Sequence, residues 1–272
     1  MEYVHVHGDK VPALGYGTWL LRDSDCYESV KHALELDYRH IDTAQGYDNE
    51  EFVGQALKDS GVARDNIFLT TKVKPDNFAP QDLLDSSRES LRKLQTDYVD
   101  LLLLHWPNPD VPLEDTLGAM QQLQDEGATR HVGISNFPPS LAATAHEQVK
   151  VFANQVEYHP FLAQNKLLAQ AEELDYMLTA YSPIARGKVV GDEVLEQIAK
   201  AHNKTSVQVT LRWQVQQQRV STIPKAASAE HRESNFDIFD FELSQDEMDA
   251  IFALNREERL VDPDGMSPAW ER

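Results

Sequence analysis

Short apolar stretches alternate with helix-like stretches along nearly all of the 272 residues of this chain. The apolar stretches that predict strands are 13–18, 40–42, 67–72, 99–104, 129–135, 153–156, 177–181 and 221–224. Stretches of helical period fill the gaps, at 25–36, 49–60, 79–94, 113–126, 138–146, 166–174, 192–204 and 206–217. Strands joined by helices pair in parallel, because parallel neighbours need long crossovers. The alternation therefore predicts an α/β fold, a (β/α)8 TIM barrel.

Features at both ends add to this barrel without marking a second domain. Residues 3–9 predict a hairpin before the first strand, and 229–236 and 244–254 predict two extra helices after the last one. The polar segment 255–272 contains Pro and Gly and is expected to be a loop. No break in composition divides the chain, so we expect a single domain over its full length, residues 1–272.

The chain is strongly acidic, with 45 acidic against 25 basic side chains and a net charge of −20. Such a surface repels nucleic acid and anionic lipid, so we expect neither as a partner. An ordinary acidic protein and a protein adapted to a salty cytoplasm both fit this charge. The single Cys26 excludes an intramolecular disulfide and a cysteine-based zinc site. We expect a cytoplasmic location, since neither a signal peptide nor a membrane-spanning run is evident.

Four ionisable side chains follow three consecutive predicted strands. Asp42 ends the second strand, and Tyr47 lies in the loop after it. Lys72 ends the third strand and His105 the fourth, so all four belong to the face where barrel enzymes carry out catalysis. Lys72 is expected to pair with Asp42 and to lower the pKa of Tyr47, which makes Tyr47 a proton donor near neutral pH. With His105 orienting a carbonyl, this arrangement predicts carbonyl reduction by hydride.

Further polar side chains follow the later strands on the same face. Ser135 and Asn136 end the fifth strand, and Gln155 lies in the sixth. Tyr181 ends the seventh strand and offers a flat face for a nicotinamide ring, and Asn136 and Gln155 are placed to hold the amide of that ring. Lys225 ends the eighth strand and adds a positive charge.

Six segments, in this order, resemble those of the aldo-keto reductase family. They are Asp42-Thr-Ala-Gln-Gly-Tyr-Asp-Asn-Glu50, Leu102-Leu-Leu-His-Trp-Pro107, Val132-Gly-Ile-Ser-Asn-Phe137, Asn154-Gln-Val-Glu-Tyr-His-Pro160, Ala180-Tyr-Ser-Pro183 and Ile223-Pro-Lys225. The resemblance covers nearly the whole chain and implies a reductase with NADP(H) across the C-terminal face of the barrel. It implies Tyr47 as general acid, Lys72 and Asp42 as the pair that tunes it, and His105 as the group that orients the substrate.

The residues that the resemblance implies for the cofactor follow the same face. They are Ser135, Asn136, Gln155 and Tyr181 for the nicotinamide, Ser182, Pro183 and Ile184 for the pyrophosphate, and Lys225, Ser228, His231, Arg232 and Asn235 for the adenine end. His231 stands where relatives often carry an arginine over the adenine and 2′-phosphate, and Ala226 where many carry serine. Because histidine is only partly charged at neutral pH, we expect NADPH to be preferred over NADH by a reduced margin.

Three tryptophans are placed to shape a substrate pocket. Trp19 and Trp106 follow the first and fourth strands, and Trp270 lies in the tail, which folds over the pocket in this family. The tail from Arg259 onward resembles that of short bacterial members, which reduce small aldehydes, 2-oxoaldehydes such as methylglyoxal and keto-sugar acids. The resemblance therefore implies a compact pocket for small polarised carbonyls, in a protein that is a monomer.

Other folds and functions fit parts of the sequence. A regulatory or interaction protein that binds the cofactor on the same fold would keep these segments. An open doubly wound sheet would need a third glycine that 15–20 lacks. His5-Val6-His7 has the histidine spacing of metal-dependent hydrolase barrels, but it lies in the predicted hairpin, which we expect to close the opposite face. We therefore expect no metal site.

Overall fold

A computed structural model describes residues 1–271. Its main sheet has eight strands in the order β3 to β10, each parallel to its neighbours. These strands are β3 (Tyr16–Gly17), β4 (His40–Asp42), β5 (Phe68–Val73), β6 (Val99–Leu104), β7 (Thr129–Ser135), β8 (Ala153–Glu157), β9 (Met177–Tyr181) and β10 (Val220–Thr222). Every predicted strand is present, and β6, β7 and β9 have the predicted bounds.

The sheet curls until its first and last segments meet. A parallel bridge joins Leu14 to Thr222. The amide of Gly15 donates to the Thr222 carbonyl at 2.8 Å, and the amide of Thr222 donates to the Ala13 carbonyl at 2.8 Å. The predicted strand 13–18 is regular only at β3, and a Cβ on Gly17 would lie 2.7 Å from a backbone oxygen of Ile223. Glycine lets these segments approach closely, so the (β/α)8 barrel closes here.

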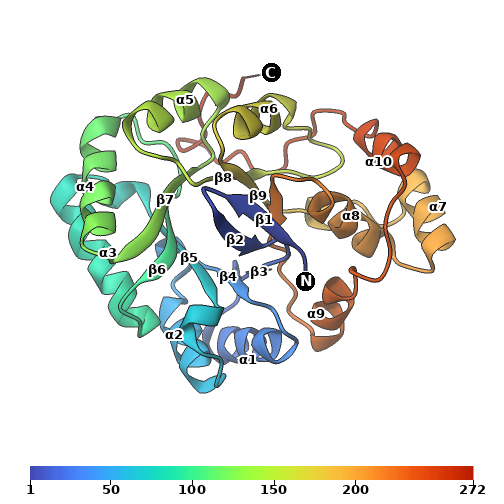
Figure 1. The fold of residues 1–272 in the computed structure, drawn as a ribbon, viewed down its shortest axis with the longest axis horizontal. Helices are drawn as coiled ribbons and strands as arrows, with labels where there is room; N and C mark the ends of the chain where they lie inside the picture. The colour runs from blue at the N-terminus through green and yellow to red at the C-terminus, as the bar shows by residue number, and fades with distance from the viewer. Residues whose placement is uncertain (272) are drawn as a thin grey trace.

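Helices form a ring around the strands (Figure 1). They are α1 (Asp23–Glu35), α2 (Glu50–Asp59), α3 (Pro80–Leu94), α4 (Leu113–Asp125), α5 (Pro139–Gln148), α6 (Asn165–Glu173), α7 (Glu193–His202), α8 (Ser206–Val215), α9 (Ala229–Phe236) and α10 (Gln245–Phe252). Side-chain caps at Asp192, Thr205, Ser228 and Ser244 begin the last four. The two extra helices predicted after the last strand are α9 and α10. Within residues 1–271, none of the helices is long and apolar enough to cross a membrane.

The hairpin of β1 (Tyr3–Val6) and β2 (Asp9–Pro12) crosses the centre of the ring of strands (Figure 1). The carbonyl of His5 accepts a hydrogen bond from Arg219, which precedes β10, at 3.1 Å. The amide of His7 donates to Asp175, which precedes β9, at 3.3 Å. The hairpin therefore covers the N-terminal ends of the strands, as expected. This places His5 and His7 at the opposite end of the barrel from the predicted site.

Candidate active site

The ion pair between Lys72 and Asp42 forms the base of the site. Both side chains are buried, and the Lys72 Nζ lies 2.6 Å from the Asp42 Oδ1. The ammonium also donates to the Thr43 carbonyl at 2.8 Å and to the Tyr47 hydroxyl oxygen at 3.4 Å. Three acceptors match the three protons of an ammonium, whereas a neutral amine has only two. Burial lowers the pKa of Lys72, and the Asp42 carboxylate opposes that shift.

The hydroxyl of Tyr47 belongs to the same cluster, but its pKa moves in the direction opposite to the one predicted. Burial, and then the carboxylate of Asp42, raises the pKa of Tyr47 well above its usual value. The sequence-based expectation of a lowered pKa is therefore wrong, because burial disfavours the charged phenolate and the Asp42 carboxylate adds to that effect. Tyr47 consequently keeps its proton throughout the physiological range.

The ring of His105 packs edge-on against Tyr47, with 5.6 Å between the ring centroids and 74° between their planes. His105 follows β6, and its amide donates to the carbonyl of Val73 at the end of β5, at 3.1 Å. Burial, and then the charge of Lys72, lowers the pKa of His105 to about 3. The imidazole is therefore neutral near pH 7, so one ring nitrogen donates a hydrogen bond and the other accepts one.

The predicted amide-binding residues form a chain of hydrogen bonds beside the ion pair. Tyr181 donates its hydroxyl proton to the Asn136 Oδ1 at 2.7 Å, and the Asn136 Nδ2 donates to the His105 carbonyl at 3.0 Å. The Ser135 hydroxyl donates to the Gln155 carbonyl at 2.8 Å. The Gln155 Nε2 donates to the Asp42 Oδ2 at 2.7 Å. Gln155 thus fixes the second oxygen of the Asp42 carboxylate, a contact that the sequence did not predict.

Several residues other than glycine hold left-handed backbone conformations in loops at this face. Asn136 has a φ of 63°, and Ser182, Ala185 and Arg186 in the loop after β9 have φ values of 48°, 49° and 53°. Side chains with a Cβ adopt this region at a cost, which is smallest for asparagine. Strain of this kind occurs at functional sites, and these four residues lie in loops of the face that the sequence assigned to the cofactor, while other turns and helix ends of the chain hold it too.

A cleft of about 390 Å³ lies between the loop after β3 and the loop after β10. Lys225 lines it with an exposed side chain, and Asp25 and Glu28 add negative charge to its wall. Arg232 also lines the cleft, but its side chain is buried and donates to the Ser29 hydroxyl at 3.0 Å and to backbone carbonyls. Arg232 is thus held by the protein itself, which leaves Lys225 as the accessible predicted cation.

The remaining predicted adenine-end residues lie on α9 beside this cleft. The Ser228 hydroxyl oxygen accepts the His231 amide at 3.2 Å, so it caps the helix. His231 is exposed and Asn235 is buried. Pro183 and Ile184, in the loop after β9, are buried and partly buried. The structure thus brings these residues to the C-terminal face.

Two of the three predicted pocket tryptophans meet. The rings of Trp106 and Trp270 lie 6.4 Å apart with 69° between their planes. Trp106 is buried, and it is the next residue after His105. The tail therefore returns to the active face, as expected. Trp19 does not join this pair; it is 44% exposed, and the guanidinium carbon of Arg186 lies 5.6 Å from its ring centre.

Several residues of this face were missed by sequence reasoning. The buried Asn49 accepts a hydrogen bond from the Thr43 hydroxyl at 2.7 Å and donates to the carbonyl of Thr18 at 2.9 Å. It thereby ties the loop after β4 to the loop after β3. Glu157 is fully buried at the end of β8. A buried glutamate rarely lacks a partner, so its place in an apolar strand was the signal that could have found it.

A sequence model described as "Aldo/keto reductase family" matches residues 13–256. The chain belongs to the aldo/keto reductase family. This aldo/keto reductase is 42% identical to the methylglyoxal reductase DkgB of Escherichia coli O157:H7, over 96% of the chain and 99% of that protein. It is also 42% identical to the glyoxal reductase of Bacillus subtilis strain 168, over 95% of both chains.

Solved structures agree with this membership. A protein provisionally described as 2,5-diketo-D-gluconic acid reductase B has a TM-score of 0.98 and 44% identity to this aldo/keto reductase, over 100% of the chain and 98% of that protein. A Bombyx mori aldo-keto reductase in complex with NADP has a TM-score of 0.89 and 31% identity, over 96% and 94%. The chain is therefore an oxidoreductase of this family, as the sequence segments implied.

Proposed function

We propose that this aldo/keto reductase reduces small aldehydes and 2-oxoaldehydes with NADPH, and that Tyr47 donates the proton. One observation carries the proposal: the Tyr47 hydroxyl lies 3.4 Å from a buried ammonium that Asp42 holds in place. The names of the relatives, which are methylglyoxal and glyoxal reductases, support the substrate class. Keto-sugar acids are a second substrate class, favoured by the likeness to 2,5-diketo-D-gluconic acid reductase B.

The proton step follows from the raised pKa of Tyr47. A phenol that stays protonated at neutral pH is ready to give its proton, but its anion is a strong base and needs stabilisation. That stabilisation comes from Lys72, whose Nζ already donates to the phenolic oxygen. The ammonium therefore acts as negative charge develops on the oxygen, which is when an electrostatic contact contributes most to the rate.

His105 and the amide residues position the reactants. The neutral imidazole of His105 lies edge-on to Tyr47, so its N–H can donate to the same carbonyl oxygen that Tyr47 protonates. Two donors at one oxygen polarise the carbonyl and fix its orientation. A bound NADPH would supply the hydride.

The residues present fit a dinucleotide along this face. Asn136 and Gln155 offer side-chain amides near the ion pair, and the ring of Tyr181 lies beside Asn136. The cleft past β10 ends at the first turn of α9, where backbone N–H groups favour an anion. Lys225 adds the accessible charge for a 2′-phosphate.

Consumption of the cofactor tests the function. The purified protein should lower the absorbance at 340 nm when NADPH and methylglyoxal are both present, and less efficiently with NADH. No loss of absorbance with methylglyoxal, a nitrobenzaldehyde or a keto-sugar acid would refute the proposal.

Lys225→Met tests the cofactor preference. Removing one charge-assisted contact to a phosphate should raise the KM for NADPH about tenfold. The KM for NADH should stay unchanged, because NADH lacks the 2′-phosphate. Equal losses with both cofactors would show that Lys225 does not read the phosphate.

A further inference from the structure

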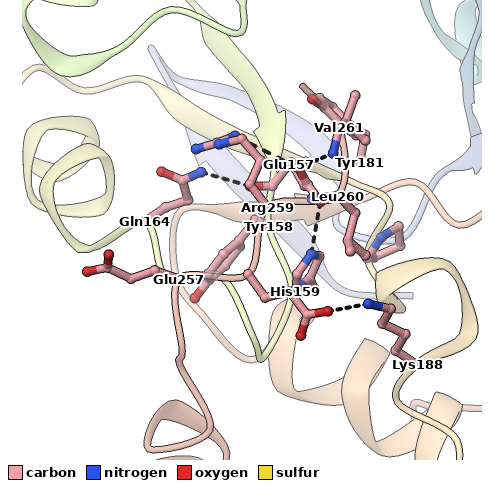
Figure 2. A network of polar contacts seen from close by, with 12 residues as sticks. Glu157, Tyr158, His159, Gln164, Tyr181, Lys188, Glu257, Arg259, Leu260 and Val261 are labelled. Carbon is pink, nitrogen blue, oxygen red and sulfur yellow. Dashed lines mark hydrogen bonds and ion pairs between the residues drawn. The ribbon is translucent and has the colours of Figure 1, made fainter. Parts of the chain in front are cut away.

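The carboxylate of Glu157 is bound by the C-terminal tail, which comprises residues 255–271. Its Oε1 accepts the amide of Leu260 at 2.8 Å, and its Oε2 accepts the amide of Val261 at 3.0 Å (Figure 2). The His159 Nε2 lies 3.0 Å from Oε1, and the Arg259 Nη1 lies 3.8 Å from Oε2. Glu157 is 0% exposed. A fully buried carboxylate therefore fixes two consecutive peptide groups of a segment without regular structure.

The residues beside these two peptides lead back to the active face. The guanidinium carbon of Arg259 lies 3.5 Å from the ring centre of Trp270, and the Trp270 Nε1 donates to Asp262 at 2.9 Å. The ring of Trp270 contacts that of Trp106, the residue that follows His105. A short series of contacts thus runs from the buried carboxylate to a wall beside the predicted substrate-orienting imidazole.

The tail has a second ionic contact, but it is at the surface. Glu258 pairs with Lys188 from the loop after β9, and with Arg256 at 2.7 Å. Half of the Lys188 side chain is exposed, as is half of Arg256. Exposed pairs contribute about 0–1 kcal/mol, whereas a buried carboxylate with several donors is costly to disturb. The amides of Arg256 and Glu258 also donate to the Phe161 carbonyl, at 3.3 Å and 2.9 Å, so Glu157 is the buried charged anchor among several contacts of the tail.

Strand β8 connects this anchor to the catalytic pair. Gln155 and Glu157 are two residues apart on the strand, so their side chains leave the same face of it. Gln155 holds the Asp42 carboxylate, and Glu157 holds the tail. One short strand thus contacts both the Asp42 carboxylate and the tail.

We infer that Glu157 is a positioning residue for the substrate site: it acts through the tail, by placing Arg259 and Trp270 against Trp106. The inference deepens the proposed function and rests on it, because it assigns these side chains to the pocket for small carbonyls. It also gives a specificity rule. A wall fixed by the tail confines the pocket, so loss of the anchor affects binding of small substrates rather than the chemical step.

Glu157→Gln tests the inference in the full-length protein. The amide keeps the size of the side chain but turns one acceptor into a donor that faces a backbone N–H. The KM for methylglyoxal should rise about tenfold, while kcat and the affinity for NADPH, measured by quenching of protein fluorescence, stay within about twofold. A rise in KM alone marks lost binding, whereas a general loss of structure would move kcat and cofactor affinity as well.

Tryptic release of the tail is a readout that needs no catalysis. Mass spectrometry should show faster cleavage after Arg259 in Glu157→Gln than in the parent, because the bond that trypsin attacks lies beside the anchored Leu260 amide. If the parent fails to reduce any carbonyl, the proposed function falls, yet this measurement still tests the anchor. Equal cleavage rates in the two proteins would overturn the anchor itself.

Two further variants separate positioning from stability. Asp100→Asn changes another buried carboxylate, at the far end of the barrel, and should leave KM unchanged. Trp270→Leu removes the wall directly, at a side chain that is only partly buried. It should raise the KM for methylglyoxal to a similar extent, and the double variant with Glu157→Gln should be no worse than either single variant. Additive effects, or an unchanged KM in Glu157→Gln despite a released tail, would overturn the inference.

Discussion

Each end of the barrel combines a carboxylate, a cationic side chain and a phenol, but the cation and the surroundings differ between the two ends. At the C-terminal end, Asp42, Lys72 and Tyr47 combine a carboxylate, an ammonium and a phenol. Asp42 and Lys72 are buried, with the Lys72 side chain 0% exposed, and Tyr47 is partly buried. The phenolic oxygen accepts a hydrogen bond from the ammonium, and no carboxylate within residues 1–271 accepts its proton. The proton of Tyr47 is therefore available to another molecule.

At the N-terminal end, Asp100 and Tyr98 combine with two guanidinium groups. Arg64 donates to the Asp100 Oδ2 at 2.8 Å, and Arg130 lies 3.1 Å from the Oδ1. The guanidinium carbons lie 4.1 Å and 4.5 Å from the centre of the Tyr98 ring. Tyr98 donates its proton to Asp65 at 2.7 Å and accepts from Arg130 at 3.0 Å. The Tyr98 hydroxyl and both oxygens of Asp100 are thus engaged within the protein.

The comparison shows how similar groups can support either chemistry or stability. Arginine spreads its charge over a planar group that stacks on a ring and binds several acceptors, and here its side chains reach solvent. Lysine concentrates its charge at one atom, and burial directs that atom at the phenolic oxygen. The Asp100 cluster at the N-terminal end therefore keeps its tyrosine proton bonded within the protein, whereas the Lys72 cluster at the C-terminal end leaves the Tyr47 proton available.

The largest difference between the two ends should appear when Tyr47→Phe is compared with Tyr98→Phe. Loss of a general acid should lower kcat with NADPH and methylglyoxal by about 10³-fold to 10⁴-fold, while NADPH still binds. Tyr98→Phe should leave kcat unchanged and lower the free energy of unfolding by about 1 kcal/mol, because Asp65 loses its hydrogen bond. Steady-state kinetics and urea unfolding check the pair. Substantial activity in Tyr47→Phe would remove the assignment of the proton donor.

Asp100→Asn, at the N-terminal end, should lower stability without lowering activity, which is the reverse of the effect expected for Tyr47→Phe. The change leaves Arg64 without its ionic partner and weakens the bond from the Leu69 amide to the Asp100 Oδ2, now 2.9 Å. The free energy of unfolding, measured with urea, should fall by about 3 kcal/mol. The kcat for methylglyoxal at 25 °C should not change. A fall in kcat without loss of stability would mean that the two ends are coupled.

The smallest expected effect concerns pH and two partly buried histidines, one near each end. Burial lowers the pKa of His105 to about 3 and that of His7 to about 4. Between these values and about 6.5 the unfolded chain binds more protons than the folded one, so stability should fall as pH falls through that window. kcat/KM should nevertheless vary less than about twofold between pH 5.5 and 8, because neither His105 nor Tyr47 titrates there. Thermal unfolding and initial rates over this range check both statements.

An acid limb in kcat/KM near pH 6.5 would contradict a neutral His105. It would indicate an imidazole with an ordinary pKa, and hence a site more open to water than the buried one described here. The same experiment on Tyr98→Phe provides the control, since that change lies at the N-terminal end of the barrel, away from His105.

Much of the fold, and the set of polar residues that follow the strands, could be predicted because both depend on patterns that are local in the sequence. The bounds of β6, β7 and β9 agree with the prediction, since turn or loop residues flank each of these strands. Asp42, Lys72 and His105 each follow a strand, and parallel strands bring their ends to one face. The strand at 13–18 was predicted too long, because its pairing depends on a close approach to the segment after β10.

Details of the site depended on distances between segments far apart in sequence. The pKa of Tyr47 was predicted in the wrong direction, since its value depends on burial and on the Asp42 carboxylate. Arg232 was assigned to the cofactor, yet it is buried against Ser29 and backbone carbonyls. Glu157 was missed as an anchor because its partners lie about a hundred residues away.

The sequence by itself determined which residue types reach the C-terminal face, because strand period and parallel pairing place the residue after each strand there. Only the tertiary structure decided what each group does, because charge, burial and hydrogen bonding depend on atoms within a few ångströms. The protonation of Tyr47 and His105 and the path of the tail are such outcomes. They follow from the low dielectric of a closed site, where each partner gained or lost shifts an equilibrium strongly.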